Sequence, residues 1–226
     1  MKKVCKINRQ YRYGIALLLG LFFCNTLVIH AQYFNPKGVL AIDLSIPTNE
    51  RNLALRNTME GLVHTGIAYQ YNVWKGMTIG GGVNYSFFKA DHFALQSSMG
   101  RGGMHMPAGH LKLGYEKFTT ERFAMYGGLR GGYSAIVVVN DSCTAMMDQP
   151  FQTYAPFLEL QFEITMLTES NGQDGFNIGL GYSFYFETYN RDFLCREDLP
   201  TILDEHTQGI IRFLSIGFGY KYFFQK

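Results

Sequence analysis

The sequence lacks any apolar segment after residue 31 that is long enough to cross a membrane as an α-helix. It also lacks a repeat with a period of 20–50 residues, which excludes a solenoid. Prolines are few, and only Cys143 and Cys195 follow residue 24 among the cysteines. What is abundant is glycine, phenylalanine and tyrosine, in a chain whose length suits one domain.

Residues 1–31 have the organisation of a secretory signal peptide. Five basic residues precede the apolar segment 14–24, and the small residue Ala31 is suited to the cleavage position. The apolar segment is too short to span a bilayer. A lipoprotein signal at Cys24 is the alternative, but the bulky Phe23 stands where such a signal has a small residue.

Cleavage after Ala31 leaves residues 32–226 as the predicted mature chain. It removes five positive charges and no negative ones, so the net charge changes from +2 to −3. No basic surface for nucleic acid is then expected, and we predict no nucleic-acid partner. The export compartment permits disulfides.

Strict alternation of apolar and small or polar residues is the main structural signal. From Ser215 to Phe224, aromatic and aliphatic side chains occupy every second position, and two glycines and Lys221 lie between them. We predict eight strands with this alternation, at 38–45, 62–72, 77–87, 110–118, 122–137, 157–166, 176–187 and 215–224.

The connections between these segments are alternately long and short. Those after the first, third, fifth and seventh segments are long, and those between are turns of a few residues. This is the pattern of membrane barrels with short periplasmic turns and longer outside loops. The sequence therefore predicts an all-β fold, an eight-stranded antiparallel transmembrane β-barrel formed by residues 32–226.

The composition of the two strand faces supports a membrane barrel over a soluble one. A closed barrel pairs every backbone group without leaving an edge, as lipid requires. The alternative is a soluble sandwich or lipocalin-like barrel with its apolar face inside. The second face here holds so many glycine, serine, asparagine and charged residues that it would form a poor dry core. Aromatic residues near both strand ends suit the two membrane interfaces.

The signal ending at Ala31–Gln32, the eight alternating segments and the final "FGYKYFF" resemble small outer-membrane barrels of the OmpA/OmpX type. More narrowly, they resemble the PorT-like outer-membrane β-barrel proteins of Bacteroidota. The resemblance implies a bacterial outer-membrane location, outer-membrane lipid around the barrel and both barrel termini in the periplasm. In that family the last strand is read by the assembly machinery. Here Gln225 and Lys226 follow Phe224, which departs from that pattern.

Charged residues of both signs fall on the predicted inward face. Buried charges are costly unless they are paired, so we predict a network of ion pairs that fills the lumen. Pairing of the fifth and sixth strands places Arg130 close to Glu159. A gated pore, in which the pairs exchange partners, is the alternative, although eight strands leave little room for a permanent channel. The predicted network comprises Asp43, Lys112, Glu116, Arg130, Glu159, Glu163, Glu187 and Lys221.

Two features fall in the predicted long loops. Met99, Met104, His105 and Met106 are expected to form a contact surface, since methionine is common on adaptable surfaces. Thioether and imidazole groups also suit Cu(I), which is the alternative, but we predict no metal or cofactor. A disulfide between Cys143 and Cys195 would join two neighbouring loops, and free thiols or a redox switch are the alternatives.

Residues for catalysis are few. An enzyme on a small barrel needs a nucleophile and a base, or paired carboxylates, at its rim. The candidates show no recognisable spacing, and they are Asp91, His92, Ser97, Ser98, Asp204, Glu205 and His206. We therefore predict a non-enzymatic structural or accessory barrel whose outside loops contact a protein partner in the envelope. A small gated pore and a lipid-modifying enzyme are the alternatives.

Overall fold

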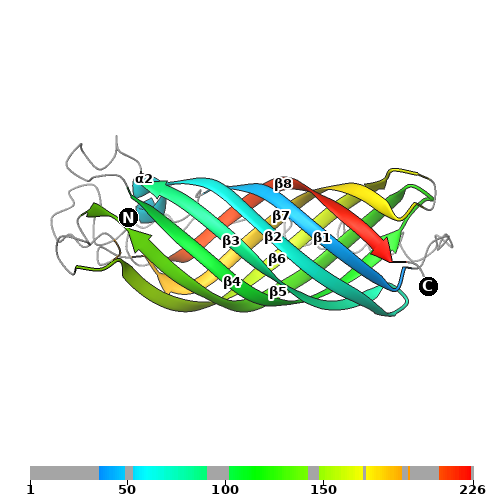
Figure 1. Ribbon diagram of the computed structural model, residues 1–226, viewed down its shortest axis with the longest axis horizontal. Coiled ribbons are helices and arrows are strands. Elements are labelled where there is room, and N and C mark those ends of the chain that lie inside the picture. The colour runs from blue at the N-terminus through cyan, green and yellow to red at the C-terminus, as the bar shows by residue number, and fades with distance from the viewer. Residues whose placement is uncertain are drawn as a thin grey trace, which may run out of the picture.

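The computed structural model describes residues 36–48, 53–90, 102–141, 148–169, 172–189, 193 and 209–224. These residues form one closed barrel in which each strand pairs with the next and β8 pairs with β1 (Figure 1). All pairs are antiparallel, which confirms the predicted architecture. The strands are β1 (Gly38–Thr48), β2 (Met59–Trp74), β3 (Met77–Ala90), β4 (Gly103–Phe118), β5 (Phe123–Val139), β6 (Phe151–Leu167), β7 (Asp174–Thr188) and β8 (Ile210–Phe224).

The two ends of the barrel differ in their connections. The β2–β3, β4–β5 and β6–β7 connections are short and lie at one end, called here the short-turn end. At Lys75 and Gly76 both central residues have positive φ, 44° and 91°, as a two-residue primed hairpin turn requires. The other connections are longer and lie at the opposite end, called here the long-connection end (Figure 1).

The strands extend further toward the long-connection end than the sequence predicted. β4 begins at Gly103 rather than His110, and β8 begins at Ile210 rather than Ser215. The reason is that the inward positions of these extensions are apolar, whereas those nearer the middle of the barrel are polar. Phe88 is fully buried inside the barrel while its neighbour Phe87 lies half-buried against the outer wall. Period-two alternation of polarity is therefore absent where the strand itself continues.

The outer wall is apolar and much of the interior is polar, the reverse of the arrangement in a soluble protein. Leu111, Ile178 and Phe218 are 71%, 70% and 65% exposed. Such a surface suits hydrocarbon rather than water, which is the arrangement of a transmembrane barrel. Exposed aromatic side chains lie toward both ends of the strands, with Trp74, Phe123, Phe176 and Phe224 at the short-turn end and Tyr133, Tyr154 and Phe186 toward the other.

The interior has three layers. At the short-turn end lies a small apolar cluster in which the rings of Phe118 and Phe223 meet edge to face, 5.5 Å apart. The middle layer holds charged and polar side chains. The layer toward the long-connection end is an apolar core, called here the outer core. Its main members are Phe88, Met104, Met106, Ile136, Val138, Phe157, Tyr185 and Phe213.

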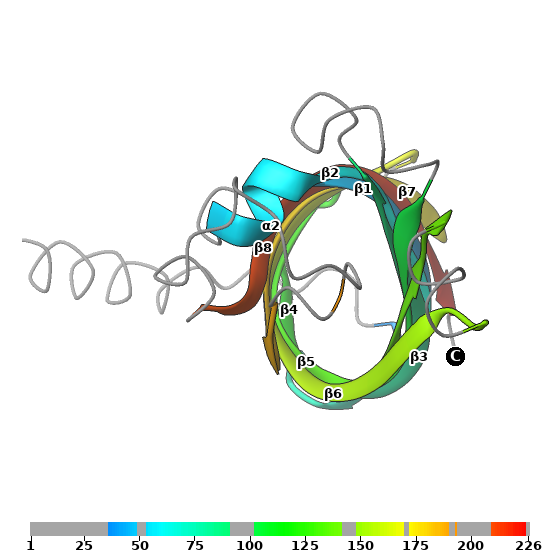
Figure 2. The ribbon, with the colours of Figure 1, turned by 90° about the vertical axis from the view of Figure 1, so that its left-hand side faces the viewer.

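The short helix α2 (Leu53–Thr58) belongs to the outer core. Figure 2 shows it at the rim of the long-connection end. Ala54 and Leu55 are fully buried in the core. The Thr58 hydroxyl donates to the Ala54 carbonyl at 2.7 Å and lies 2.9 Å from the Tyr189 hydroxyl. In the part of the chain that the structure describes, no helix is long and apolar enough to cross a membrane.

Candidate functional site: the charged layer of the lumen

The middle layer is built from alternate positions of several strands. Lys112 and Glu116 on β4 lie four residues apart, so both point inward. The same spacing holds for Glu159 and Glu163 on β6. Strand alternation thus carries charges from different strands into one layer. The other charged members are Asp43 on β1, Arg130 on β5 and Lys221 on β8.

Two lysines and two glutamates form the part of this layer nearer the short-turn end. Lys221 Nζ lies 2.8 Å from Glu116 Oε1 and 2.8 Å from Glu163 Oε2. Lys112 Nζ donates to the other oxygen of Glu163 at 3.2 Å. Both lysines are fully buried, so Glu163 is held between two cations that have no access to solvent.

Tyr126 packs its ring against both lysines. The Lys112 and Lys221 ammonium nitrogens lie 4.2 Å and 5.1 Å from the ring centroid, within cation–π range. Gly114 and Gly128 make room for this ring, because a Cβ atom at either position would collide with the Tyr126 hydroxyl. The two glycines are therefore required by the charged layer and not only by the strand.

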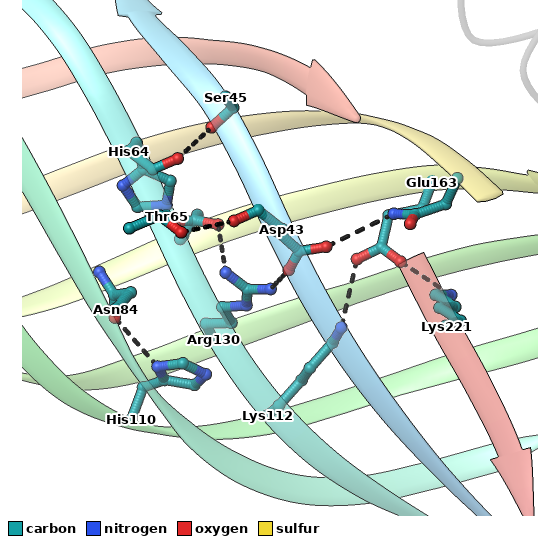
Figure 3. A network of polar contacts seen from close by, with 12 residues as sticks. Asp43, Ser45, His64, Thr65, Asn84, His110, Lys112, Arg130, Glu163 and Lys221 are labelled. Atoms are coloured by element: carbon teal, nitrogen blue, oxygen red, sulfur yellow. Dashed lines mark hydrogen bonds and ion pairs between the residues drawn. The ribbon is translucent and has the colours of Figure 1, made fainter. Parts of the chain in front are cut away.

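Arg130 is the centre of the second part of the layer. Its Nη2 donates to Asp43 Oδ2 at 2.7 Å (Figure 3). Its Nη1 lies 3.6 Å from Glu159 Oε1. Ser183 donates to the other oxygen of Glu159 at 2.9 Å. His64 Nε2 lies 3.9 Å from the same oxygen. One guanidinium thus joins carboxylates from two strands, β1 and β6.

Histidine, serine and asparagine side chains complete the layer toward the outer core. His64 Nδ1 lies 2.7 Å from the Ser86 hydroxyl, and His110 Nδ1 lies 3.0 Å from the Asn84 side-chain oxygen. The polarity of the lumen thus falls toward the long-connection end, from ion pairs, through histidines, to the aromatic rings of the outer core. Phe213 meets His64 edge to face at 6.1 Å and marks that boundary.

Little free space remains between these side chains. A cavity of about 30 Å³ lies beside Asp43, His64, Arg130 and Glu159. This volume is enough for a water molecule or two, which need roughly 10–15 Å³ each. Such a space can hydrate a polar network.

The predicted charge network is largely present. The sequence-based pairing of Arg130 with Glu159 is confirmed, since the two residues are direct partners in the β5–β6 register. Glu187 was wrongly included. It is half-buried between Tyr185 and Tyr189, both members of the outer core, and the described residues show no ion pair between it and the network.

The predicted methionine loop is wrong for the residues that the structure describes. Met104, His105 and Met106 lie in β4, not in a loop. Met104 and Met106 are fully buried in the outer core, while His105 faces the other side of the strand. They therefore form neither a common contact surface nor a shared copper site, because strand alternation sends them in opposite directions.

Other sequence-based candidates lie outside the described residues. These are the signal peptide 1–31, Met99, the two cysteines Cys143 and Cys195, and the loop residues considered for catalysis. Their roles stay predictions.

Several contributors to the layer were not predicted as part of the site. Tyr126, His64 and Ser183 all occupy inward positions, and that position was the available signal. The sequence marks them as inward, but it does not show that Tyr126 lies over two lysines from different strands. That contact depends on how the closed barrel sets β4 against β8 across the lumen.

Comparisons with known proteins yield structural neighbours but no sequence match. No family model matches the chain, and no curated protein is similar to it in sequence. Neisserial surface protein A is similar in structure, with 10% identity, 83% of this chain and 97% of that chain covered, and a TM-score of 0.48. Ail, the attachment invasion locus protein of Yersinia pestis, in complex with sucrose octasulfate, is also similar in structure. It has 11% identity, 84% of this chain and 100% of that chain covered, and a TM-score of 0.43.

The outer membrane protein OprG from Pseudomonas aeruginosa is also similar, with 12% identity, 84% of this chain and 98% of that chain covered, and a TM-score of 0.42. No functional residue carries over from these proteins. The closed barrel follows from the strand pairing of this chain itself.

Proposed function

We propose that this protein is a closed, non-conducting outer-membrane β-barrel with a non-enzymatic structural or accessory role. The observation that carries the proposal is the filled lumen. Side chains are buried in three successive layers, and the cavity within the charged layer holds about 30 Å³. A barrel with this interior acts through its wall and its ends rather than by passing solutes.

The wall and the termini support the membrane placement. The exposed apolar band requires hydrocarbon around the barrel. Gly38 and Phe224 are partners in the β1–β8 register, so both barrel termini lie at the short-turn end. Placing that end in the periplasm directs the long connections outward, in line with the resemblance to PorT-like barrels. The long connections are then the surface for a protein partner.

Single-channel recording of the refolded protein in planar bilayers tests the closed state. We expect no conductance steps, because ion pairs and aromatic rings fill the lumen. Gel mobility of unboiled and boiled samples verifies that the recorded protein is a folded barrel. Clear steps that disappear in Arg130→Glu would instead establish the gated pore.

Affinity purification from the native outer membrane in mild detergent tests the accessory role. We expect a stoichiometric protein partner that is lost when residues 92–100 are replaced by a glycine–serine segment of equal length. The matched control replaces 169–173 at the other end, which should leave the partner bound. A barrel that purifies alone, or that loses its partner equally in both variants, contradicts a role for the long connections.

The lipid-modifying alternative would be supported if a deletion strain had altered lipid A and the wild-type gene restored the original lipid A. We expect the lipid A of that strain to be unchanged.

A further inference from the structure

The outer wall carries a groove of about 660 Å³, which begins near mid-barrel and extends toward the long-connection end. Short side chains of Thr65, Val83 and Ala135 line it together with Gly109. Its volume lies within the range of small-molecule sites, which is about 300–1,000 Å³. Elsewhere the outer wall carries many large exposed apolar side chains, so a depression of this size is a distinct feature of it.

The shape of the groove follows from the strand register. Gly109 on β4 lies between Val83 on β3 and Tyr133 on β5. Tyr85, two pairs further along β3, is opposite Pro107. Tyr85 and Tyr133 therefore stand on the two strands that flank β4, which has no long side chain at this level. A Cβ atom at Gly109 would meet nothing within 4 Å, so the floor is open.

A polar pair lies at one end of this apolar groove. Tyr85 Oη is 2.6 Å from His105 Nδ1, and the Phe87 ring packs 4.8 Å from the His105 ring. If tyrosine donates, His105 keeps an N–H at Nε2, and if histidine donates, Tyr85 keeps its O–H. In either tautomer one donor of the pair has no partner among the described residues.

From these features we propose that the groove binds one acyl chain of a lipid from the surrounding bilayer. An ester or phosphate oxygen of that lipid accepts the remaining hydrogen bond of the Tyr85–His105 pair. Hydrocarbon offers no acceptor, so an unpaired donor on the wall is unfavourable until a lipid oxygen reaches it. The depression between two tyrosines has room for a single chain, whereas the broad wall of a second barrel would span it without filling it.

The headgroup charge is expected to matter little. Glu60 and Lys89 are partners in the β2–β3 register at the end of the wall beyond the Tyr85–His105 pair. Their opposite charges offset one another. Recognition therefore depends on the acyl chain and on the oxygen at its head, and phosphatidylethanolamine and phosphatidylglycerol should bind alike.

Native mass spectrometry of the purified full chain, titrated with each of these two phospholipids, tests the site. We expect one lipid to remain bound to the wild type, and Gly109→Leu to weaken its retention by about tenfold by filling the groove. Gly127→Leu is the matched control. Gly127 is also an exposed strand glycine with no atom within 4 Å of an added Cβ, and it does not line the groove. The control should retain lipid like the wild type.

Tyr85→Phe supplies a second test that leaves the groove volume unchanged. We expect weaker retention than in Tyr115→Phe, a matched change of an exposed tyrosine near the other end of β4. The proposal is overturned if Gly109→Leu retains as much lipid as Gly127→Leu and Tyr85→Phe retains as much as Tyr115→Phe. So does an adduct with the mass of a second barrel or of an acylated protein.

The site rests on the membrane placement proposed above, but the two fail differently. A protein that does not fractionate with the outer membrane refutes the placement. A correctly placed, folded barrel without a retained lipid refutes only the site.

Discussion

The charged layer and the outer core fill the same lumen by opposite means. In the charged layer, Lys221 joins β8 to β4 and β6, and Arg130 joins β5 to β1 and β6 through directional contacts. In the outer core, Phe213 packs against Phe88 at 5.2 Å and Tyr185 at 5.7 Å without any charge. The first layer penalises a misplaced strand heavily, while the second stabilises by burial and tolerates adjustment.

Removal of one cation should have the largest effect. Lys221→Met leaves Glu116 without its lysine partner and Glu163 with only Lys112. We expect the free energy of unfolding to fall by about 3–5 kcal/mol, because a buried carboxylate is left uncompensated. Urea unfolding of the barrel in lipid vesicles measures this change. A loss no larger than that of a surface lysine such as Lys75→Met would contradict a buried ion-pair layer.

Truncation in the outer core should have the next largest effect. Met104→Ala removes a fully buried side chain, and we expect a loss of about 3 kcal/mol from lost burial and the cavity left behind. The same unfolding assay applies. Met166→Ala, at a 52% exposed position of the outer wall, is the control and should cost less. The reverse order would place Met104 outside a packed core.

The hydrogen bond that ties α2 to the barrel should contribute less. Thr58→Val keeps the shape of the side chain and removes the hydroxyl that bonds both the Ala54 carbonyl and the Tyr189 hydroxyl. We expect a loss of about 1–2 kcal/mol, since one hydrogen bond usually contributes about 1 kcal/mol net. Thr58→Ser, which keeps the hydroxyl, should lie closer to the wild type. Identical losses in both variants would assign the effect to packing of the methyl group.

Neutralising a whole pair should have the smallest effect and sharpens the comparison most. In Lys221→Met combined with Glu116→Gln, one buried charge of each sign disappears and Glu163 keeps Lys112. We expect the double variant to recover most of the stability lost in Lys221→Met, since well-packed neutral replacements of a buried pair are often neutral. A double variant as unstable as the single one would show that Lys221 acts mainly through Glu163.

Sequence reasoning succeeded where the two strand faces differ in polarity. Alternation marks Arg130 and Glu159 as inward, and antiparallel pairing of the consecutive strands β5 and β6 brings them together. It failed at Met104 because the inward residues there are apolar and the outward His105 is polar, which reverses the pattern of the other strands. It also could not find the Lys221–Glu116 pair. That contact joins β8 and β4, which are not neighbours in the sheet, and it depends on barrel closure.

Lys221 lies on β8, the strand that closes the barrel against β1, and this position has a consequence for how the lumen is completed. Until β8 docks, Glu116 lacks its lysine, Glu163 keeps only Lys112 and Tyr126 stacks on one cation instead of two. A chain that stops before β8 thus exposes unmatched carboxylates inside an open sheet as well as two free edges. The charges of the lumen are consequently matched only once β8 has closed the sheet.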